Sequence, residues 1–78
     1  MMNVDVELDL SGLTCPMPLL KTKQALNKME SGQVVKVSAT DPGSERDFQV
    51  FAKQSGNELL SMKICAEQSM FHYWLKKK

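Results

Sequence analysis

One cysteine of this sequence stands directly before two closely spaced prolines. The segment Cys15-Pro16-Met17-Pro18 precedes a stretch with helical periodicity, so we expect the thiol of Cys15 at the start of a helix. The aligned peptide dipoles of a helix place partial positive charge at its N-terminus, and this charge favours the nucleophilic thiolate. The chemistry predicted for this position is that of a reactive sulfur.

The prolines define how that sulfur is presented. Pro16 and Pro18 are tolerated in a first helical turn because the N–H groups there lack intrahelical acceptors. If Cys15 is the N-cap, Met17 offers the nearest amide free to face the sulfur. Pro16 also restricts the preceding residue to extended conformations, so Cys15 is expected to project from a stiff platform. Such a thiol suits a group that is passed between proteins.

Two other readings of Cys15 compete with this one. Cysteine is often a small buried hydrophobic residue with no chemical role. A redox pair of the Cys-X-X-Cys type is disfavoured, because position 18 is proline. Transfer of a persulfide by a single thiol requires no such neighbour.

The elements that must position the motif follow from hydrophobic periodicity. Strands are predicted where apolar residues alternate, and helices where they recur every three or four residues. The predicted strands cover residues 4–10, 34–39, 60–64 and 71–75, and the predicted helices cover residues 18–30 and 44–55. Ser44, with Asp47 three residues later, resembles a helix cap, and Gly56 suits the left-handed position that ends a helix.

The order β-α-β-α-β-β predicts an α+β fold, a two-layer α/β sandwich. Strands joined through a helix should be parallel, and the last two strands should form an antiparallel hairpin. Each strand has one apolar face, so both helices should cover the same face of a mixed four-stranded sheet. With 78 residues, we expect one domain over residues 1–78.

Composition narrows the classes of function. A net charge of +1, with 42% hydrophobic and 24% charged residues, indicates a soluble globular chain without the basic field that captures nucleic acid. No apolar run is long enough to span a membrane. Two cysteines without an apolar leader favour the reducing cytoplasm, where Cys15 and Cys65 would be free thiols, although a pairing between them stays open.

Residues outside the motif have simpler interpretations. Cys65 and His72 have the parity of the solvent-facing side of the sheet, and neither belongs to a recognisable metal-ligand pattern, so no metal is expected. Met70 and Trp74 share that outward parity. If they cluster with Leu59, a dimer or partner surface becomes plausible on this face.

The segment LDLSGLTCPMPLLK, residues 8–21, resembles the signature of the TusA-like (SirA-like) sulfur carriers. Residues 39–44, 46–47 and 56–60 resemble further blocks of the same family, so the resemblance covers nearly the whole chain. It implies the fold described above and a cytoplasmic protein whose motif cysteine, here Cys15, accepts sulfane sulfur as a persulfide. It also implies a donor such as a cysteine desulfurase or a rhodanese-like protein, and an acceptor protein in tRNA thiolation, cofactor synthesis, thiosulfate use or other sulfur metabolism.

The chain departs from the family pattern at four positions. Thr14 stands where arginine often precedes the cysteine, and Gln49, Ala52 and Asn57 replace proline, cysteine and histidine. These departures bear on the partner more than on the chemistry. Lys21 and Lys23 offer positive charge near the motif instead.

Arg46 and Asp41 complete the candidate partner contacts. The resemblance suggests that the loop at residues 40–44 lies near the motif cysteine. Arg46 offers fixed guanidinium donors to a partner or an anionic sulfur species, whereas Asp41 and Asp47 also suit a plain turn and helix start.

The leading hypothesis is therefore a sulfur relay through Cys15, with no cofactor and with catalysis supplied by partner proteins. Whether such a carrier counts as an enzyme stays open. Its oligomeric state would be monomer or weak dimer. The alternative is a small regulatory or RNA-binding module, against which stand the near-neutral charge and the few aromatic residues.

Overall fold

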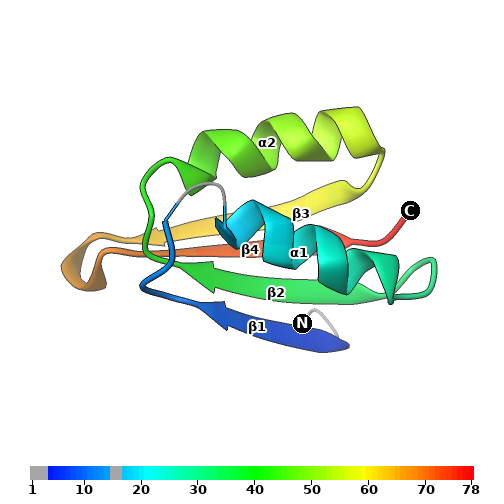
Figure 1. Ribbon diagram of the computed structural model, residues 1–78, viewed down its shortest axis with the longest axis horizontal. Helices are drawn as coiled ribbons and strands as arrows, with labels where there is room; N and C mark the ends of the chain where they lie inside the picture. Colours follow the sequence, from blue (N-terminus) through cyan, green and yellow to red (C-terminus); the bar gives the residue numbers. More distant parts are fainter. Residues whose placement is uncertain (1–3, 15–16) are drawn as a thin grey trace.

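The computed structural model describes residues 4–14 and 17–78 of the chain. Its elements follow one another as β-α-β-α-β-β, with a short 3-10 helix between the last two strands (Figure 1). They are β1 (Val6–Leu10), α1 (Met17–Asn27), β2 (Val34–Ala39), α2 (Ser44–Ser55), β3 (Glu58–Cys65), η1 (Ala66–Gln68) and β4 (Met70–Lys76).

The strands form one mixed sheet in the order β1-β2-β4-β3. β1 pairs in parallel with β2, and β4 lies between β2 and β3, antiparallel to both. Both α-helices lie on the same face of this sheet, and none of the described residues forms an α-helix on the other face (Figure 1). The predicted two-layer sandwich with its mixed four-stranded sheet is confirmed.

The core lies between the helices and the sheet. Val35 and Val37 of β2, Phe48 of α2 and Tyr73 of β4 are fully buried there, and Leu26 of α1 is 1% exposed. Each comes from the apolar parity or helical stripe of its element, so hydrophobic burial fixes which side of each element faces inward.

The first helix is shorter than predicted. α1 ends at Asn27, and Lys28 and Met29 donate to the carbonyls three residues earlier, over 3.1 Å each. Met29 is nonetheless buried, because the i to i+3 turn that follows α1 keeps it on the core-facing side, next to Leu26. Periodicity therefore locates the buried residue correctly and overestimates the helix.

A bulge changes the parity of the third strand. The register of β3 against β4 shifts between Leu59 and Ser61, so that Leu59 faces Leu75 and Met62 faces Tyr73. Leu59 packs against the core as a result. Leu59 therefore does not join Met70 and Trp74 on the open face of the sheet, and the condition set for a partner surface there is not met.

Candidate functional site

The reactive motif lies in the connection from β1 to α1. Cys15 and Pro16 fall outside the described residues, so the predicted projection of the thiol is not described, and the site is built from the residues on either side. The N–H of Met17 donates to the carbonyl of Thr14 over 2.9 Å. The expectation that the Met17 amide is free to face the sulfur is wrong, because the carbonyl of Thr14 is its acceptor.

Pro18 anchors the start of α1. Its side chain is buried, and its carbonyl accepts a 2.8 Å hydrogen bond from the hydroxyl of Thr22, which is itself fully buried. Met17 and Leu20, on the outer side of the same turn, are 38% and 43% exposed. The first turn of α1 is therefore held by the buried Pro18 and Thr22, and it exposes two apolar side chains, Met17 and Leu20, on its outer side.

The loop before the motif is fastened to the loop after β2. Gly12 has a φ of +83°, and its N–H donates to Oγ1 of Thr40 over 2.8 Å. Asp9 accepts hydrogen bonds from both the N–H and the hydroxyl of Ser11, at 3.2 and 2.7 Å, and these bonds lower the pKa of Asp9 below its usual range. The loop that leads to the motif is thus held in two places: Asp9 and Ser11 bond within it, and Gly12 bonds to Thr40 of the neighbouring loop.

The second loop is organised around Asp41. Its side-chain oxygen Oδ1 accepts from the N–H of Gly43 over 3.2 Å, and its carbonyl accepts from the N–H of Ser44 over 3.0 Å. This is the arrangement of an Asx turn that leads into a helix. Asp41 is therefore a structural residue of the loop, whatever else it contacts.

The predicted cap at Ser44 is wrong. Gly43 is the N-cap of α2, and among the described residues no side-chain hydrogen bond caps this helix. Ser44 turns inward instead, 2% exposed, and its hydroxyl lies 2.7 Å from that of Tyr73. Burial raises the pKa of Tyr73, the hydrogen bond between the Tyr73 and Ser44 hydroxyls partly opposes that rise, and three nearby carboxylates add to it. The serine satisfies a buried phenol that has no other polar partner among the described residues.

Both helices begin at the same end of the sheet (Figure 1). This follows from the topology, because β1 and β2 are parallel and each leads into the helix that comes next. The positive ends of both helix dipoles therefore lie at the end of the molecule that carries the motif loop. That electrostatic environment favours a thiolate.

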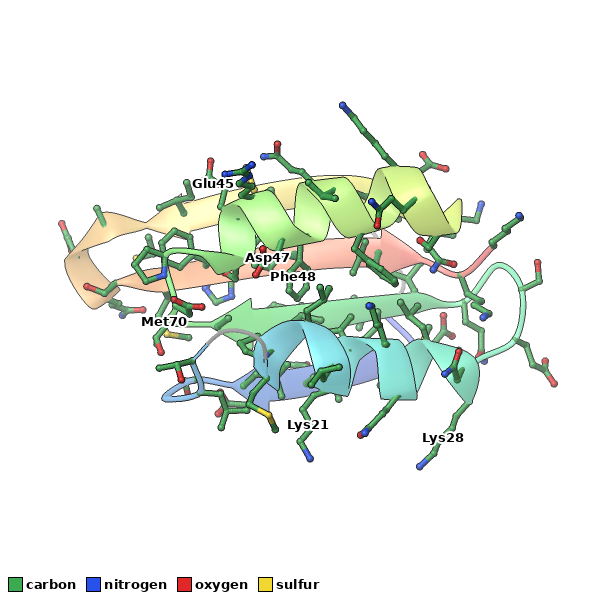
Figure 2. The ribbon with its side chains drawn as sticks, turned by 45° about the horizontal axis from the view of Figure 1, so that its top comes forward. Lys21, Lys28, Glu45, Asp47, Phe48 and Met70 are labelled. Carbon is green, nitrogen blue, oxygen red and sulfur yellow. The ribbon has the colours of Figure 1, made fainter. Side chains whose placement is uncertain are left out.

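The structure separates the candidate partner contacts into two groups. Lys21 extends from the side of α1 that lies away from α2, as does Lys28 (Figure 2). Lys23 lies on the other side of α1, with its ammonium 5.5 Å from the centre of the Phe51 ring. Lys23 and Arg46 therefore lie on the same surface, between the two helices, and Lys21 lies on a different side of α1.

A groove of about 370 Å³ runs between the two helices, and we call it the inter-helix groove. It is lined by Leu19, Lys23, Arg46, Asp47, Val50, Phe51 and Gln54. Because Leu19 belongs to the first turns of α1, the groove begins next to the motif end of the helix. It offers a partner two cations, one carboxylate and an apolar floor.

Sequence reasoning did not find the contacts that three residues make to position this end of the molecule. Thr40 holds the motif loop, and the pair Ser44 and Tyr73 holds the start of α2 against the sheet. The polar turn around Asp41 and the family resemblance of residues 39–44 signal this region in the sequence, but not these contacts. Nothing in the spacing of Gly12 and Thr40 indicates that they meet.

The remaining polar candidates lie on the open face of the sheet. Cys65 is a free thiol opposite Met70, and His72 is half-buried with Nδ1 2.9 Å from the hydroxyl of Ser38. Within residues 4–14 and 17–78, no three histidine, cysteine or acidic side chains gather as a metal site would require. None of the described helices is long and apolar enough to cross a bilayer.

Comparison with known proteins extends these observations. The family model described as sulfurtransferase TusA matches residues 6–77. The sulfur carrier protein TusA of Allochromatium vinosum is 56% identical over 77 residues, which are 99% of each chain. The sulfur carrier protein TusA of Pseudomonas syringae pv. syringae is 40% identical over 77 residues, covering 99% of this chain and 89% of that one. The crystal structure of a SirA-like protein from Desulfitobacterium hafniense has the same fold, with a TM-score of 0.80 at 24% identity over 91% of this chain and 95% of that one.

Proposed function

Because this chain belongs to the TusA family, we propose that it is a sulfur carrier that holds sulfane sulfur as a persulfide on Cys15. A carrier acts through contact with one protein that supplies the sulfur and another that takes it. The near full-length similarity to proteins named sulfur carrier protein TusA supports this role. The geometry around the motif indicates how the role is performed.

The proposed reaction has two displacement steps. The Cys15 thiolate attacks the terminal sulfur of a donor persulfide, a new S–S bond forms on Cys15, and the donor cysteine leaves as a thiolate. A nucleophile of the acceptor then attacks the terminal sulfur on Cys15, and the Cys15 thiolate leaves. No electrons are gained or lost overall, so the relay itself requires no redox cofactor.

The observation that carries the proposal is the construction of the motif end of the molecule. The loop before Cys15 is fixed through Gly12 and Thr40, and the helix after it is fixed through Pro18 and Thr22. Both helix N-termini lie at this end (Figure 1). A thiol between two fixed anchors in a positive field fits a group that partners must find without first ordering a loop.

Docking would use the surface around the first turn of α1. Met17 and Leu20 offer exposed apolar contacts, and Lys23 and Arg46 offer positive charge along the inter-helix groove. A donor or acceptor with an acidic patch beside an apolar one would fit this surface. Pro16 and Pro18 stiffen the motif, while Lys21 and Asp41 lie aside from the groove as secondary candidates for contact.

We further propose the setting in which the relay operates. The chain acts as one domain over residues 1–78, in the cytoplasm, as a monomer or weak dimer and without a cofactor. Its donor is a cysteine desulfurase or a rhodanese-like protein, and its acceptor belongs to tRNA thiolation, cofactor synthesis or thiosulfate and related sulfur metabolism. The partner active sites supply the acid and base catalysis.

A transfer experiment with radiolabelled sulfur tests the relay. The chain is loaded by a cysteine desulfurase and labelled cysteine, separated from the donor, and mixed with a candidate acceptor such as a rhodanese-like protein. We expect label to reach the acceptor from the wild type and from Cys65→Ser, and not from Cys15→Ser. Label that reaches the acceptor equally well from Cys15→Ser would refute a carrier role for this thiol.

The regulatory or RNA-binding alternative has a different signature. It predicts salt-sensitive binding of RNA that does not change in Cys15→Ser. A net charge of +1 and three phenylalanines, one tyrosine and one tryptophan give such binding little basis. No observation on the described surface favours it over the relay.

A further inference from the structure

One apolar surface of the molecule lies apart from the inter-helix groove through which the proposed relay would dock. A groove of about 440 Å³ lies between α1 and β1, on the side of α1 away from α2, and we call it the edge groove. It is lined by Val6, Leu8, Leu10, Lys21, Gln24, Ala25, Lys28, Met29 and Gln33. Figure 2 shows Lys21 and Lys28 extending from α1 along this side of the molecule.

The strand that forms one wall of the edge groove is an edge of the sheet. β1 is the outermost strand next to β2, and within the described residues no further strand pairs with it. A strand at an edge presents the N–H and C=O groups of every second residue to its free side. The edge groove therefore combines an apolar surface with a strand edge to which no described strand pairs.

The side chains of β1 divide by face. Val6 and Leu8 are half-buried, with their exposed parts lining the edge groove. Glu7 and Asp9 are exposed and project to the opposite, open face of the sheet, because side chains alternate along a strand. An added strand would meet apolar side chains on one of its faces and carboxylates on the other.

We propose that the edge groove is a docking site for an extended protein segment whose side chains alternate between apolar and basic. The segment adds to the free edge of β1, its apolar side chains enter the groove, and its lysines or arginines lie beside Glu7 and Asp9. Backbone hydrogen bonds give such an added strand its affinity, and the alternation of side chains gives it specificity. The aliphatic stems of Lys21 and Lys28 complete the apolar wall while their ammonium groups stay in water.

Charge decides against a second copy of this chain as the occupant. If two β1 strands paired with each other, the acidic residues of one copy would stand opposite those of the other on the open face. Like charges directly opposite on paired strands are destabilising. The carboxylates of β1 therefore discourage self-pairing and favour a basic partner segment.

Nuclear magnetic resonance with a synthetic hexapeptide tests this site. The probe is acetyl-Lys-Val-Lys-Ile-Lys-Val-amide, and the matched controls are its Glu-for-Lys counterpart and a version N-methylated at alternate residues. We expect the first peptide to shift the amide signals of β1 and to slow their hydrogen exchange. The acidic and N-methylated peptides should bind at least about tenfold more weakly, since one loses charge complementarity and the other loses the backbone bonds.

Two surface variants locate the binding. Glu7→Lys should weaken the probe by about two- to fivefold, whereas Glu58→Lys, an exposed position at the other edge strand, should leave it unchanged. Ala25→Gln, which fills the edge groove, should weaken it further without Cys15 being touched. Signal changes confined to β3 or to the inter-helix groove, equal binding of the acidic peptide, or dimerisation through β1 would overturn the proposal.

Discussion

The backbone amide of Gly12 donates to the side-chain oxygen Oγ1 of Thr40 over 2.8 Å. These residues are far apart in the sequence and belong to the loops that follow β1 and β2. Their bond fastens the loop before the motif cysteine to the loop that starts α2. Parallel pairing of β1 with β2 places the two loops at the same end of the sheet. The hydrogen bond between Gly12 and Thr40 therefore depends on the sheet topology, and it holds the loop that precedes the reactive motif.

Replacing Thr40 tests the importance of that bond. Thr40→Val removes the acceptor with little change of shape and should lower the free energy of unfolding by about 1 kcal/mol. Thr40→Ser keeps the hydroxyl and should lose much less. Denaturant unfolding measures both variants, and hydrogen exchange at the Gly12 amide should quicken in Thr40→Val alone. Unchanged exchange at Gly12 would show that the bond does not hold the loop.

The backbone at Gly12 gives a second prediction. Gly12 has a φ of +83°, and nothing lies within 4 Å of the position that a Cβ would take. Gly12→Ala should therefore destabilise the fold by about 1–2 kcal/mol through left-handed backbone strain alone. Gly43→Ala is the matched control, because Gly43 has a φ of −67° and its Cβ would meet only ordinary contacts with Asp41. Equal melting temperatures for the two variants would contradict this argument.

The hydroxyl pair of Ser44 and Tyr73 should behave as a coupled unit. Tyr73→Phe keeps the ring that stacks on Phe48 but leaves the buried Ser44 hydroxyl unpaired, at a cost of about 1–3 kcal/mol. Ser44→Ala should cost a similar amount. The double variant should cost less than the sum of the two single variants, by about 0.5–3 kcal/mol, in a double-mutant cycle of unfolding free energies. Simple additivity would mean that the two hydroxyls act independently.

The same tyrosine predicts a change of stability at high pH. Burial raises the pKa of Tyr73 in the folded protein, whereas the phenol of the unfolded chain ionises near pH 10. Above about pH 10 the unfolded chain therefore loses this proton first, and stability should fall as pH rises from there toward the raised pKa. The contribution is intact below pH 10. Tyr73→Phe should show a shallower alkaline loss of stability than the wild type, and parallel curves would contradict the account.

The sequence predicted the architecture well where burial alone decides it. The bounds of β2 and α2 follow from clear apolar patterns and from Gly56, which adopts the predicted left-handed conformation. It failed where a tertiary contact competes with a local rule. Ser44 bonds to the Tyr73 hydroxyl and does not cap α2, and the bulge in β3 places Leu59 on the core-facing side of the sheet.

The candidate site was predictable in its chemistry and less so in its construction. The spacing of Cys15, Pro16 and Pro18 indicates a thiol at a helix start, and α1 does begin at Met17. The acceptor of the Met17 amide is the carbonyl of Thr14, and the anchor at Thr40 depends on the sheet topology. Neither relationship is contained in local spacing.

Intact-protein mass spectrometry of the persulfide is the most direct test of the central claim. The reduced chain is incubated with a cysteine desulfurase and cysteine, and in parallel with a rhodanese and thiosulfate, and the modified peptide is then sequenced. We predict the addition of one sulfur atom on Cys15, present in the wild type and Cys65→Ser and absent from Cys15→Ser. A chain that takes no sulfur from either donor system, or takes it on Cys65 instead, would contradict the account.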